Sequence, residues 1–372
     1  MLIPTLEKLV SFKTLSRDHK ENRDALDWVQ NELRDLPLHS ERFSVNGFPA
    51  LVATTQKTKS PKMWLQAHID VVGGPENVFE IEYKDKRAYG RGVYDMKFAA
   101  ACYIELLKDL KDKISDYDLG LMLTTDEELG GFHGTKVLLD KGYGGEVCIL
   151  PDGGFNWALE EAAKGVLQLI VRSYGTSAHS SRPWEGRNAV EILAEFMNKL
   201  KNEFESEPCG DDKHLHNTLS FTVTTSGKNI NNNKIPNYAE TIADIRFMPD
   251  MNRKDVYNII EKVKKDFTGI ELDEYFFADS FKNDMKNGYY SALVESAKDL
   301  FDINIGTSLS HGSSDARYFA AKGITPLVIA PNGGGHHSEH EWIDTEDLER
   351  FYRVLKDFAL KKGRVEKPVS RV

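Results

Sequence analysis

Four short apolar runs in this chain lead into side chains that commonly bind metals. The runs are KMWLQ, LGLMLTT, EVCIL and PLVIA, and turn residues bound each of them, which is typical of strands covered on both faces of a sheet. His68 follows the first run, Glu127 and Glu128 the second, Asp152 the third and His337 the fourth. Ligands of open α/β sheets bind at the carboxyl ends of parallel strands. We therefore expect these side chains to gather at one sheet edge.

Helical periodicity alternates with these strands in the first part of the chain. Residues 21–36 and 97–110 carry apolar side chains at helical spacing, and a short helix is expected over 135–140. Helix and strand patterns alternate again from residue 289 onward. This alternation predicts an α/β fold with a mainly parallel sheet and helices on both of its faces.

The pattern changes after residue 163. Residues 165–173, 219–226 and 239–247 alternate apolar with polar side chains, as half-exposed antiparallel strands do, and residues 188–201 and 256–267 have helical spacing. The order strand, helix, strand, strand, helix fits a ferredoxin-like layout. We therefore expect one domain made of residues 1–163 and 280–372, with an α+β domain of residues 164–279 inserted into it.

Composition excludes several classes of partner. The net charge of -10 argues against nucleic acid or an anionic membrane, and no apolar stretch approaches the roughly 20 residues of a membrane span. The first residues, MLIPTLEKLVSF, lack the features of a secretory signal. Cys102, Cys148 and Cys209 form no CxxC pair, and the first two lie in apolar stretches that predict buried thiols. We expect a soluble cytoplasmic protein.

Imidazole and carboxylate groups are the ligands of catalytic zinc, and paired metals can clamp the oxygens of a hydrolytic transition state. Each candidate residue also has an ordinary explanation. His68 suits a capped core histidine, Asp95 a helix cap before residues 96–110, and Asp152 an Asx turn. Glu127 and Glu128 suit a first helical turn. Independent explanations of this kind would not all collect at one sheet edge, so the sequence favours a metal site.

Two further patterns support that interpretation. Asp70 stands two residues after His68 at a strand end, so both side chains point to one face, and Asp70 can accept the imidazole N–H that a metal leaves unused. Near the C-terminus, three histidines follow three glycines within the run GGGHHSEH. A metal-binding tract explains that run better than a polar loop does.

The segments AHIDVV, GRGVYDMK, TTDEELGG, PDGG and HHSEHE, in this order, resemble one family of metallopeptidases and amidohydrolases. The family includes acetylornithine deacetylase, succinyl-diaminopimelate desuccinylase, aminoacylase, glutamate carboxypeptidase and several dipeptidases. The resemblance covers nearly the whole chain, and residues 164–279 look like the lid and dimerisation domain of that family. It implies a catalytic domain of residues 1–163 and 280–372 that binds two zinc ions.

The resemblance also implies a role for each site residue. Asp95 would bridge the two ions, His68 and Asp152 would complete the first ligand set, and Glu128 and His337 the second, with Asp70 as an orienting residue and Glu127 as the general base. The spacing to Glu341 matches the family pattern H-x-x-x-E and favours His337 over His336. A cis peptide is implied after the bridging aspartate, at Asp95-Met96. Ala67 and His133 depart from the family, which has glycine and a small residue there.

In the inserted domain, the segment SAHSSRP resembles the lid motif of the family. There a histidine, here His179, reaches the active site of the partner subunit and polarises the scissile carbonyl, which implies a homodimer. The guanidinium of Arg246 suits a substrate carboxylate, although a salt bridge with Asp244 or Glu240 explains it equally well. Segments that resemble substrate-binding parts of the family contain Asn237, Gly312 and Ser313.

These features predict a hydrolase that cleaves the amide bond of an N-acyl amino acid through a metal-bridging hydroxide, with Glu127 as the base. Its substrate would be a small molecule with a free carboxylate. Zinc is expected, although cobalt and manganese accept the same ligands. The alternatives are a dipeptidase or carboxypeptidase of the same family, an aminopeptidase that recognises a free amine, and a non-catalytic carboxylate-binding protein that keeps its metals for structure.

Overall fold

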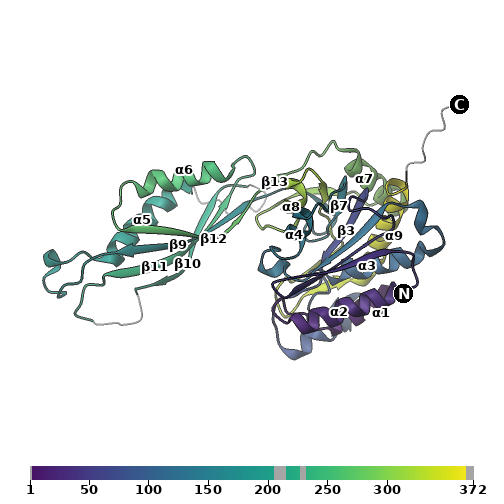
Figure 1. Cartoon of the computed structure of the whole chain (residues 1–372), viewed down its shortest axis with the longest axis horizontal. Coiled ribbons are helices and arrows are strands. Elements are labelled where there is room, and N and C mark those ends of the chain that lie inside the picture. Colours follow the sequence, from purple (N-terminus) through teal and green to yellow (C-terminus); the bar gives the residue numbers. More distant parts are fainter. Residues whose placement is uncertain (1, 205–214, 227–231, 366–372) are drawn as a thin grey trace. The chain divides into compact units, whose positions relative to one another are not determined.

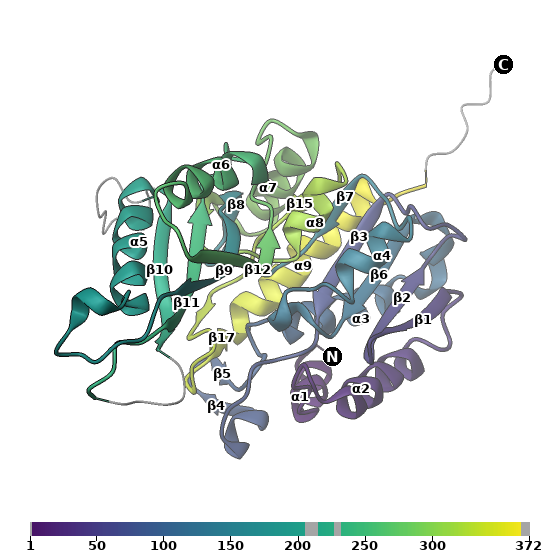
Figure 2. The same cartoon turned by 60° about the vertical axis from the view of Figure 1, so that its left-hand side comes forward.

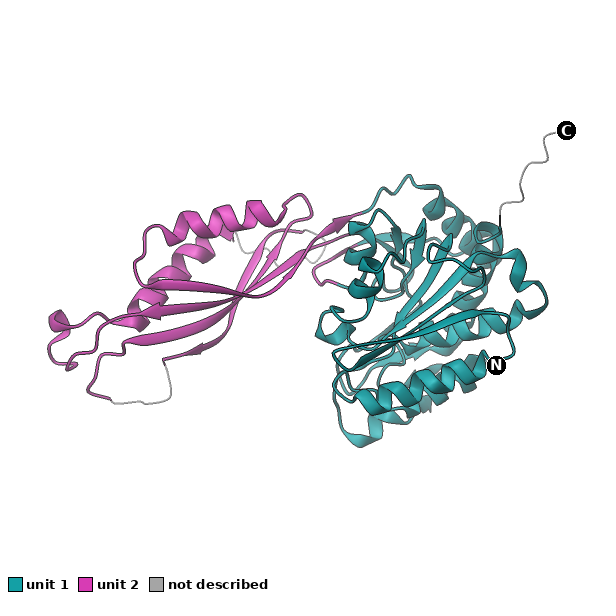
Figure 3. Cartoon of the chain, viewed as in Figure 1, with its two compact units in different colours: residues 1–161, 283–308, 314–372 teal, residues 162–282, 309–313 magenta. Residues whose placement is uncertain are grey.

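The computed structural model describes residues 2–204, 215–226 and 232–365 (Figure 1). The chain divides into two compact units, and the second is inserted into the first (Figure 3). Unit 1 comprises residues 1–161, 283–308 and 314–372, and unit 2 comprises residues 162–282 and 309–313. Cys102 and Cys148 are buried free thiols, as predicted, whereas Cys209 lies outside the described residues. Within the described ranges, no helix has the length and apolar character needed to cross a membrane.

Unit 1 is built on a six-stranded sheet of order β1-β2-β6-β3-β7-β15. Its strands are β1 (His39–Val45), β2 (Phe48–Thr54), β3 (Met63–His68), β6 (Leu119–Thr124), β7 (Val147–Ile149) and β15 (Thr325–Leu327). The four strands from β6 to β15 run parallel, and β1 and β2 are antiparallel at one edge (Figure 2). Every residue of β3, β6 and β7 is buried. The predicted mainly parallel, buried sheet is confirmed.

Helices pack against this sheet. They are α1 (Leu2–Ser11), α2 (His19–Glu32), α3 (Lys97–Asp109), α4 (Thr135–Asp140), α7 (Gly288–Phe301), α8 (Ala316–Ala321) and α9 (Thr345–Lys362). The helix α3 contacts β3, α1 and α9, and its residues from Lys97 to Leu107 are all buried. By contrast, α9 buries Leu348, Phe351, Leu355 and Phe358, which is the spacing of one helix face.

A small antiparallel sheet of order β16-β17-β5-β4 completes unit 1. Its strands are β4 (Glu82–Lys84), β5 (Arg87–Tyr89), β16 (Gly333–Gly334) and β17 (Trp342–Asp344). The pairing of Trp342 with Tyr89 joins the C-terminal histidine run to the segment that precedes Asp95. Strands of two or three residues leave no periodic pattern, so the sequence did not predict this sheet.

Unit 2 has the element order β9 (Gly165–Tyr174), α5 (Ala189–Phe204), β10 (Thr218–Thr225), β11 (Tyr238–Phe247), α6 (Arg253–Lys264) and β12 (Ile270–Ala278). Its antiparallel sheet has the order β10-β11-β9-β12, and α5 contacts α6, β9, β10 and β11. This is the predicted ferredoxin-like layout with one additional strand. The strand β12 escaped prediction because most of its residues are exposed or half-buried, without regular alternation.

The remaining strands lie where the chain passes between the units. They are β8 (Ala158–Ala163), β13 (Phe281–Lys282) and β14 (Gly306–Ser310), in the order β13-β8-β14. The predicted strand PLVIA is wrong in its second half, because β15 ends at Leu327. The carbonyls of Val328 and Ala330 instead accept the backbone N–H groups of Glu160 and Trp157. This bonding draws the chain out of the sheet before it reaches the histidine run.

Candidate metal centre

The parallel strands β6, β3 and β7 bring their carboxyl ends to one edge of the sheet. His68 is the last residue of β3, and Asp152 follows three residues after the end of β7. Glu127 and Glu128 begin the 3-10 turn η3 (Glu127–Leu129), which follows β6 after a short connection. Because these strands are neighbours in the sheet, side chains that are far apart in the sequence become adjacent in space.

Six side chains form two groups that can each hold a metal ion. The first group is His68, Glu127 and Asp152, and the second is Asp95, Glu128 and His337; within each group the potential ligand atoms lie within 4.8 Å of one another. Nε2 of His68 is 3.2 Å from Oδ1 of Asp95, and Nε2 of His337 is 3.2 Å from Oδ2 of Asp95. The two oxygens of Asp95 therefore face opposite groups, which is the arrangement of a bridging carboxylate.

The chemistry of these groups fits divalent cations. Nε2 of His68 is buried and faces Oδ1 of Asp95 at 3.2 Å. Burial and the nearby charge of Asp152 raise the pKa of Glu127 well above its ordinary value, and burial raises the pKa of Asp152 to about 7. Hydrogen bonds to Asp95 and Glu128 raise the pKa of His337 to about 10. Buried carboxylates and the imidazole nitrogens that face them are ligand types that a divalent cation binds.

The carboxylate of Asp70 holds the turn that carries the two glutamates. Its Oδ1 accepts the backbone N–H of Glu127 at 3.2 Å, and its Oδ2 accepts that of Glu128 at 3.3 Å and the hydroxyl of Ser16 at 2.8 Å. Nδ1 of His68 lies 3.0 Å from the backbone carbonyl of Asp70 and 3.5 Å from its Oδ1. The imidazole N–H thus has the backbone carbonyl of Asp70 as its nearer acceptor, and the carboxylate of the same residue lies beside it.

Asp95 does not cap the helix that follows it. The N-cap of α3 is Met96, whose side chain makes no capping hydrogen bond. The peptide Asp95-Met96 is cis, as the resemblance implied. The side chain of Asp95 is instead directed to His68 and His337. The ordinary explanation of this aspartate as a helix cap therefore fails.

The structure separates the two adjacent histidines. The His337 ring reaches the second ligand group, and its Nε2 lies 3.1 Å from Oε2 of Glu128. The His336 ring packs between aromatic side chains, with centroids 4.1 Å from Phe155 and 4.9 Å from Tyr94. Of the two, only His337 has the geometry of a ligand.

Comparison with known proteins identifies the family. Residues 64–361 match the model of peptidase family M20/M25/M40, which is most of the chain. The chain belongs to this family. A relative in Sulfurovum sp. named succinyl-diaminopimelate desuccinylase is 24% identical, over 96% of this chain and 97% of that protein. The resemblance drawn from the sequence motifs is thereby confirmed, and the chain is a hydrolase of a metal-dependent family.

Solved structures of the family share the fold. A tripeptidase from Staphylococcus aureus superposes with a TM-score of 0.78 at 19% identity, over 97% of this chain and 98% of that one. A metallo-carboxypeptidase from Sulfolobus solfataricus gives a TM-score of 0.77 at 17% identity, over 96% and 98%. At these identities the likeness concerns the fold alone.

Unit 2 contains His179 and the predicted substrate-binding residues Asn237, Gly312 and Ser313. His179 is exposed, and its Nδ1 lies 2.8 Å from the hydroxyl of Ser181. Asn237 and Gly312 are also exposed, and Ser313 is half-buried. A cavity of about 470 Å³ adjoins the lid motif, and its lining includes Ser180, Arg187, Glu191, Lys234 and Ile235. The roles of these residues in the family hydrolase stay predictions.

Arg246 is engaged in an ion pair within unit 2. Its Nε donates to Oδ1 of Asp244 at 2.6 Å and its Nη2 to Oδ2 of the same residue at 3.2 Å, while Gln168 donates to that carboxylate at 2.7 Å. The salt bridge that the sequence left open is thus present. A role of Arg246 in binding a substrate carboxylate stays a prediction.

Sequence reasoning missed buried charges that support the loop containing Glu127 and Glu128. Asp315 is fully buried and accepts the hydroxyl of Thr135 at 2.5 Å, and Arg317 donates to the carbonyl of Gly130 at 2.8 Å. Asp315 lies two residues after Ser313, which the resemblance linked to substrate binding. No pattern along the chain distinguishes a buried charge from a solvated one, so only the folded contacts show this role.

His133, which departs from the family, lies on the surface of unit 1 and not among the ligand groups. Its ring stacks on Phe48 with centroids 5.0 Å apart, and its Nδ1 lies 3.4 Å from Nδ2 of Asn46. Its backbone N–H donates to Asp126 at 2.6 Å. The residue therefore helps to fix the loop after η3.

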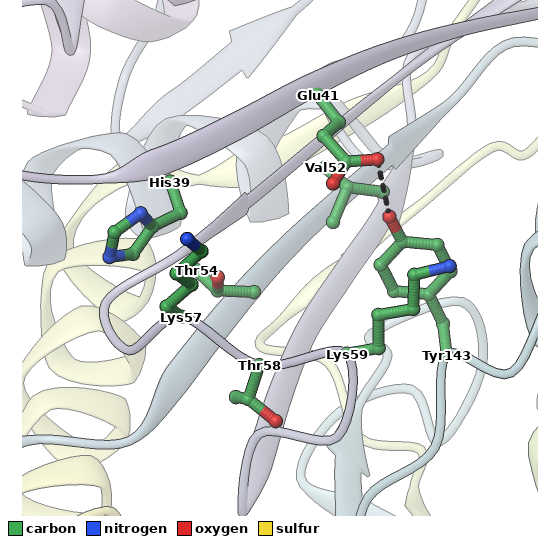
Figure 4. A pocket seen from close by; sticks show the side chains of 8 residues that line it. All are labelled: His39, Glu41, Val52, Thr54, Lys57, Thr58, Lys59 and Tyr143. Carbon is green, nitrogen blue, oxygen red and sulfur yellow. Dashed lines mark hydrogen bonds between the residues drawn. The ribbon is translucent and has the colours of Figure 1, made fainter.

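A cavity at the edge of the six-stranded sheet lies apart from the metal centre. Figure 4 shows its lining, in which Tyr143 donates to Glu41 at 3.0 Å. Its volume is about 160 Å³, and the lining residues are His39, Glu41, Val52, Thr54, Lys57, Thr58, Lys59 and Tyr143. None of these is a predicted site residue, so we do not assign the cavity to the reaction.

Proposed function

We propose that this family hydrolase uses two divalent metal ions to cleave the amide bond of an N-acyl amino acid. The observation that carries the proposal is the pair of ligand groups that meet at Asp95. His68, Asp95 and Asp152 would hold one ion, and Asp95, Glu128 and His337 the other. Paired ions of this kind lie about 3.5–4 Å apart in known hydrolases.

The donor set suits zinc, and cobalt and manganese accept the same ligands. When bound, the two ions lower the pKa of a water molecule toward about 7 and polarise the substrate carbonyl. The chain then has to supply a base for that water and an acid for the leaving amine.

Glu127 is the proposed proton carrier. Its backbone is fixed by Asp70, and its carboxylate lies in the group with His68 and Asp152. Because Asp95 would complete that ligand set as the shared ligand, Glu127 stays available for proton transfer. It would take a proton from the attacking water and deliver it to the departing amine nitrogen. Its neighbour Glu128 points to His337 instead, so the two adjacent carboxylates divide metal binding from proton transfer.

Unit 2 would supply substrate contacts in a homodimer. His179 would donate a hydrogen bond to the developing oxyanion in the site of the partner subunit, and Arg246 would bind the free carboxylate of the substrate. Asn237, Gly312 and Ser313 would line the substrate. The name of the desuccinylase relative supports an N-acyl amino acid over a free-amine peptide.

A substrate panel on the full-length protein tests the proposal. N-acetyl and N-succinyl amino acids, dipeptides and unacylated amino-acid amides would be assayed with zinc, after chelation, and after zinc is restored. We expect hydrolysis of N-acyl amino acids that chelation abolishes and zinc restores. The amide bond of the matching carboxyl methyl esters should be hydrolysed only weakly, because these esters lack the free carboxylate. Cleavage of free-amine substrates alone would contradict the proposal, as would turnover that survives metal removal.

A further inference from the structure

One buried carboxylate accepts hydrogen bonds from several backbone N–H groups of the segment that contains Asp95. Glu341 is 1% exposed. Its Oε1 accepts the backbone N–H of Tyr94 at 2.9 Å and that of Asp95 at 3.0 Å. Its Oε2 accepts the backbone N–H of Gly92 at 3.1 Å and Nη1 of Arg91 at 2.8 Å. Four donors from residues 91–95 thus converge on a single side chain that belongs to a distant part of the sequence.

Arg91, the partner of Glu341, also contacts the segment that contains His337. Arg91 is 2% exposed, and its Nη2 donates to the carbonyl of His337 at 3.3 Å and to that of Gly73 at 3.4 Å. The backbone N–H of Gly90 also donates to the carbonyl of Glu341 at 3.1 Å. The Glu341–Arg91 pair therefore links the backbones of two proposed ligands, Asp95 and His337.

We infer that Glu341, together with Arg91, is a positioning residue that sets the separation of Asp95 and His337 for the second metal ion. The inference rests on the proposed function. Both residues act on backbone groups, and their side chains are committed to the contacts above and not to the ion. Partners of this kind orient ligands, and their loss typically weakens metal affinity by about 10–100-fold.

The geometry requires both oxygens of Glu341. An amide at this position offers one acceptor oxygen and one NH2 donor. In either orientation, the NH2 group faces donors, which are the N–H groups of Tyr94 and Asp95 on one side, or Gly92 and Arg91 on the other. Glu341→Gln therefore loses two acceptor contacts and sets donor against donor, whereas Glu341→Asp keeps both oxygens on a shorter stem.

Metal titration of the full-length chain tests the inference. Zinc and cobalt affinities would be measured by calorimetry for the wild type, Glu341→Gln, Glu341→Asp and a control, Glu105→Gln. Glu105 is also buried, but its carboxylate bonds to Thr5 and Lys108 on and beside α3. The visible spectrum of bound cobalt would report ligand geometry, and the melting temperature of each metal-free variant would report the purely structural cost.

We expect the wild type to bind two ions and Glu341→Gln to bind one of them about 10–100-fold more weakly, with an altered cobalt spectrum. Glu341→Asp should recover part of that affinity. Glu105→Gln should have a lower melting temperature but wild-type affinity for both ions. Equal affinities in Glu341→Gln and the wild type would overturn the inference, as would an equal loss in the control. If Glu341→Gln does not fold, wild-type affinity in Glu341→Asp overturns it and weakened affinity upholds it. A wild type that binds fewer than two ions would instead refute the proposed function.

Discussion

At the residue scale, the proposed ligands are held by carboxylates that would not touch a metal ion. Asp70 accepts the N–H groups of Glu127 and Glu128, and Glu341 accepts those of Tyr94 and Asp95. Hydrogen bonds to charged groups contribute about 1.5–3 kcal/mol each. Because they hold the backbone of the ligand residues, these bonds fix the backbone positions from which the ligand side chains extend.

The adjacent glutamates should fail in different ways when they are substituted. Glu127→Gln removes the proposed proton carrier, so turnover should fall by about 10²–10⁴-fold with both ions retained. Glu128→Gln removes a proposed ligand, so the metal content should fall by one ion. Steady-state kinetics together with elemental analysis of the purified variants measure both effects. Substantial turnover by Glu127→Gln would refute its assignment as the base.

Sequence alone predicted the residue types of the site and their order, because each ligand lies at or shortly after the end of a buried strand or a turn. It did not predict contacts made by side chains across the fold. Arg91 and Glu341 are 250 positions apart. The sequence likewise did not decide whether Asp244 is the partner of Arg246. Alternation along a strand shows which face of the sheet a side chain lies on, but not which neighbour it contacts.

At the element scale, the loop after η3 is fitted tightly around a buried acid. Gly131 has a φ of +66°, and a Cβ there would lie 2.0 Å from Oδ1 of Asp315, which Thr135 holds in place. Gly142 has a φ of +89° with nothing within 4 Å of a Cβ. At both positions an added side chain would be strained by the left-handed backbone, but only at Gly131 would it also meet a neighbouring atom, so the two glycines form a matched pair.

We expect Gly142→Ala to cost about 1–2 kcal/mol, from the left-handed backbone alone. Gly131→Ala should cost about 1–3 kcal/mol more, because the methyl group collides with the Asp315 carboxylate. It should also lower turnover, since the same loop carries Glu127 and Glu128. Urea unfolding and kinetics of both variants measure this difference. Equal stability and activity would show that the loop accommodates the methyl group.

An acid joins the end of α3 to α9. The carboxylate of Asp109 accepts hydrogen bonds from Tyr352 Oη at 2.6 Å and from Lys356 Nζ at 2.5 Å. Burial raises its pKa, but these two hydrogen bonds outweigh burial and hold the pKa below the ordinary value of 3.8. A lowered pKa means that the ionised form stabilises the fold above pH 3.8, and that this stabilisation is lost as the pH falls below it.

Asp109→Asn should therefore reduce the free energy of unfolding by about 0.5–1 kcal/mol at neutral pH. This value is modest because the side chains of Asp109 and Lys356 are each about a third exposed. The difference from the wild type should be smaller at about pH 3 than at neutral pH, because the stabilisation is lost as the pH falls from 3.8 through the lowered pKa of Asp109. Chemical unfolding at both pH values measures it, and Asp112→Asn, an exposed acid nearby, should change little. A difference that stays constant with pH would contradict the assignment of this effect to the Asp109 charge.

Long periodic elements were predictable, and short or irregular ones were not. The strands β3, β6 and β7 are continuous apolar runs, and β11 alternates buried with half-buried residues along its whole length. The predicted strand PLVIA is shorter in the structure, because the backbone carbonyls of Val328 and Ala330 bond to Glu160 of β8 and to Trp157 just before it. The hairpin of β16 and β17, which contains His337, depends on pairing with β5 and has no local signal.

At the scale of the whole molecule, each unit has its own apolar core. The core of unit 1 surrounds the six-stranded sheet, and that of unit 2 lies between α5, α6 and the antiparallel sheet. The change from continuous to alternating apolar patterns predicted the two kinds of sheet, because sheets covered on both faces and half-exposed sheets differ in that pattern. The roles of the units as catalytic and lid domains belong to the proposal.

Mixing two inactive variants tests the proposed action of His179 across a dimer. His179→Ala lacks the oxyanion donor and Glu127→Gln lacks the base, so each alone should be nearly inactive. In a mixed dimer, one site would combine an intact Glu127 with the His179 of the other subunit. After subunit exchange, activity should recover to roughly a quarter of the wild type. No recovery in dimers shown to be mixed would refute the action across subunits.

The central claim is that two cations share Asp95. An anomalous difference map of the zinc-loaded crystal, recorded at the zinc absorption edge, tests it most directly. We predict two peaks about 3.5–4 Å apart on either side of the Asp95 carboxylate, with His68 and Asp152 on one peak and Glu128 and His337 on the other. A single peak, or peaks that Asp95 does not join, would contradict the account.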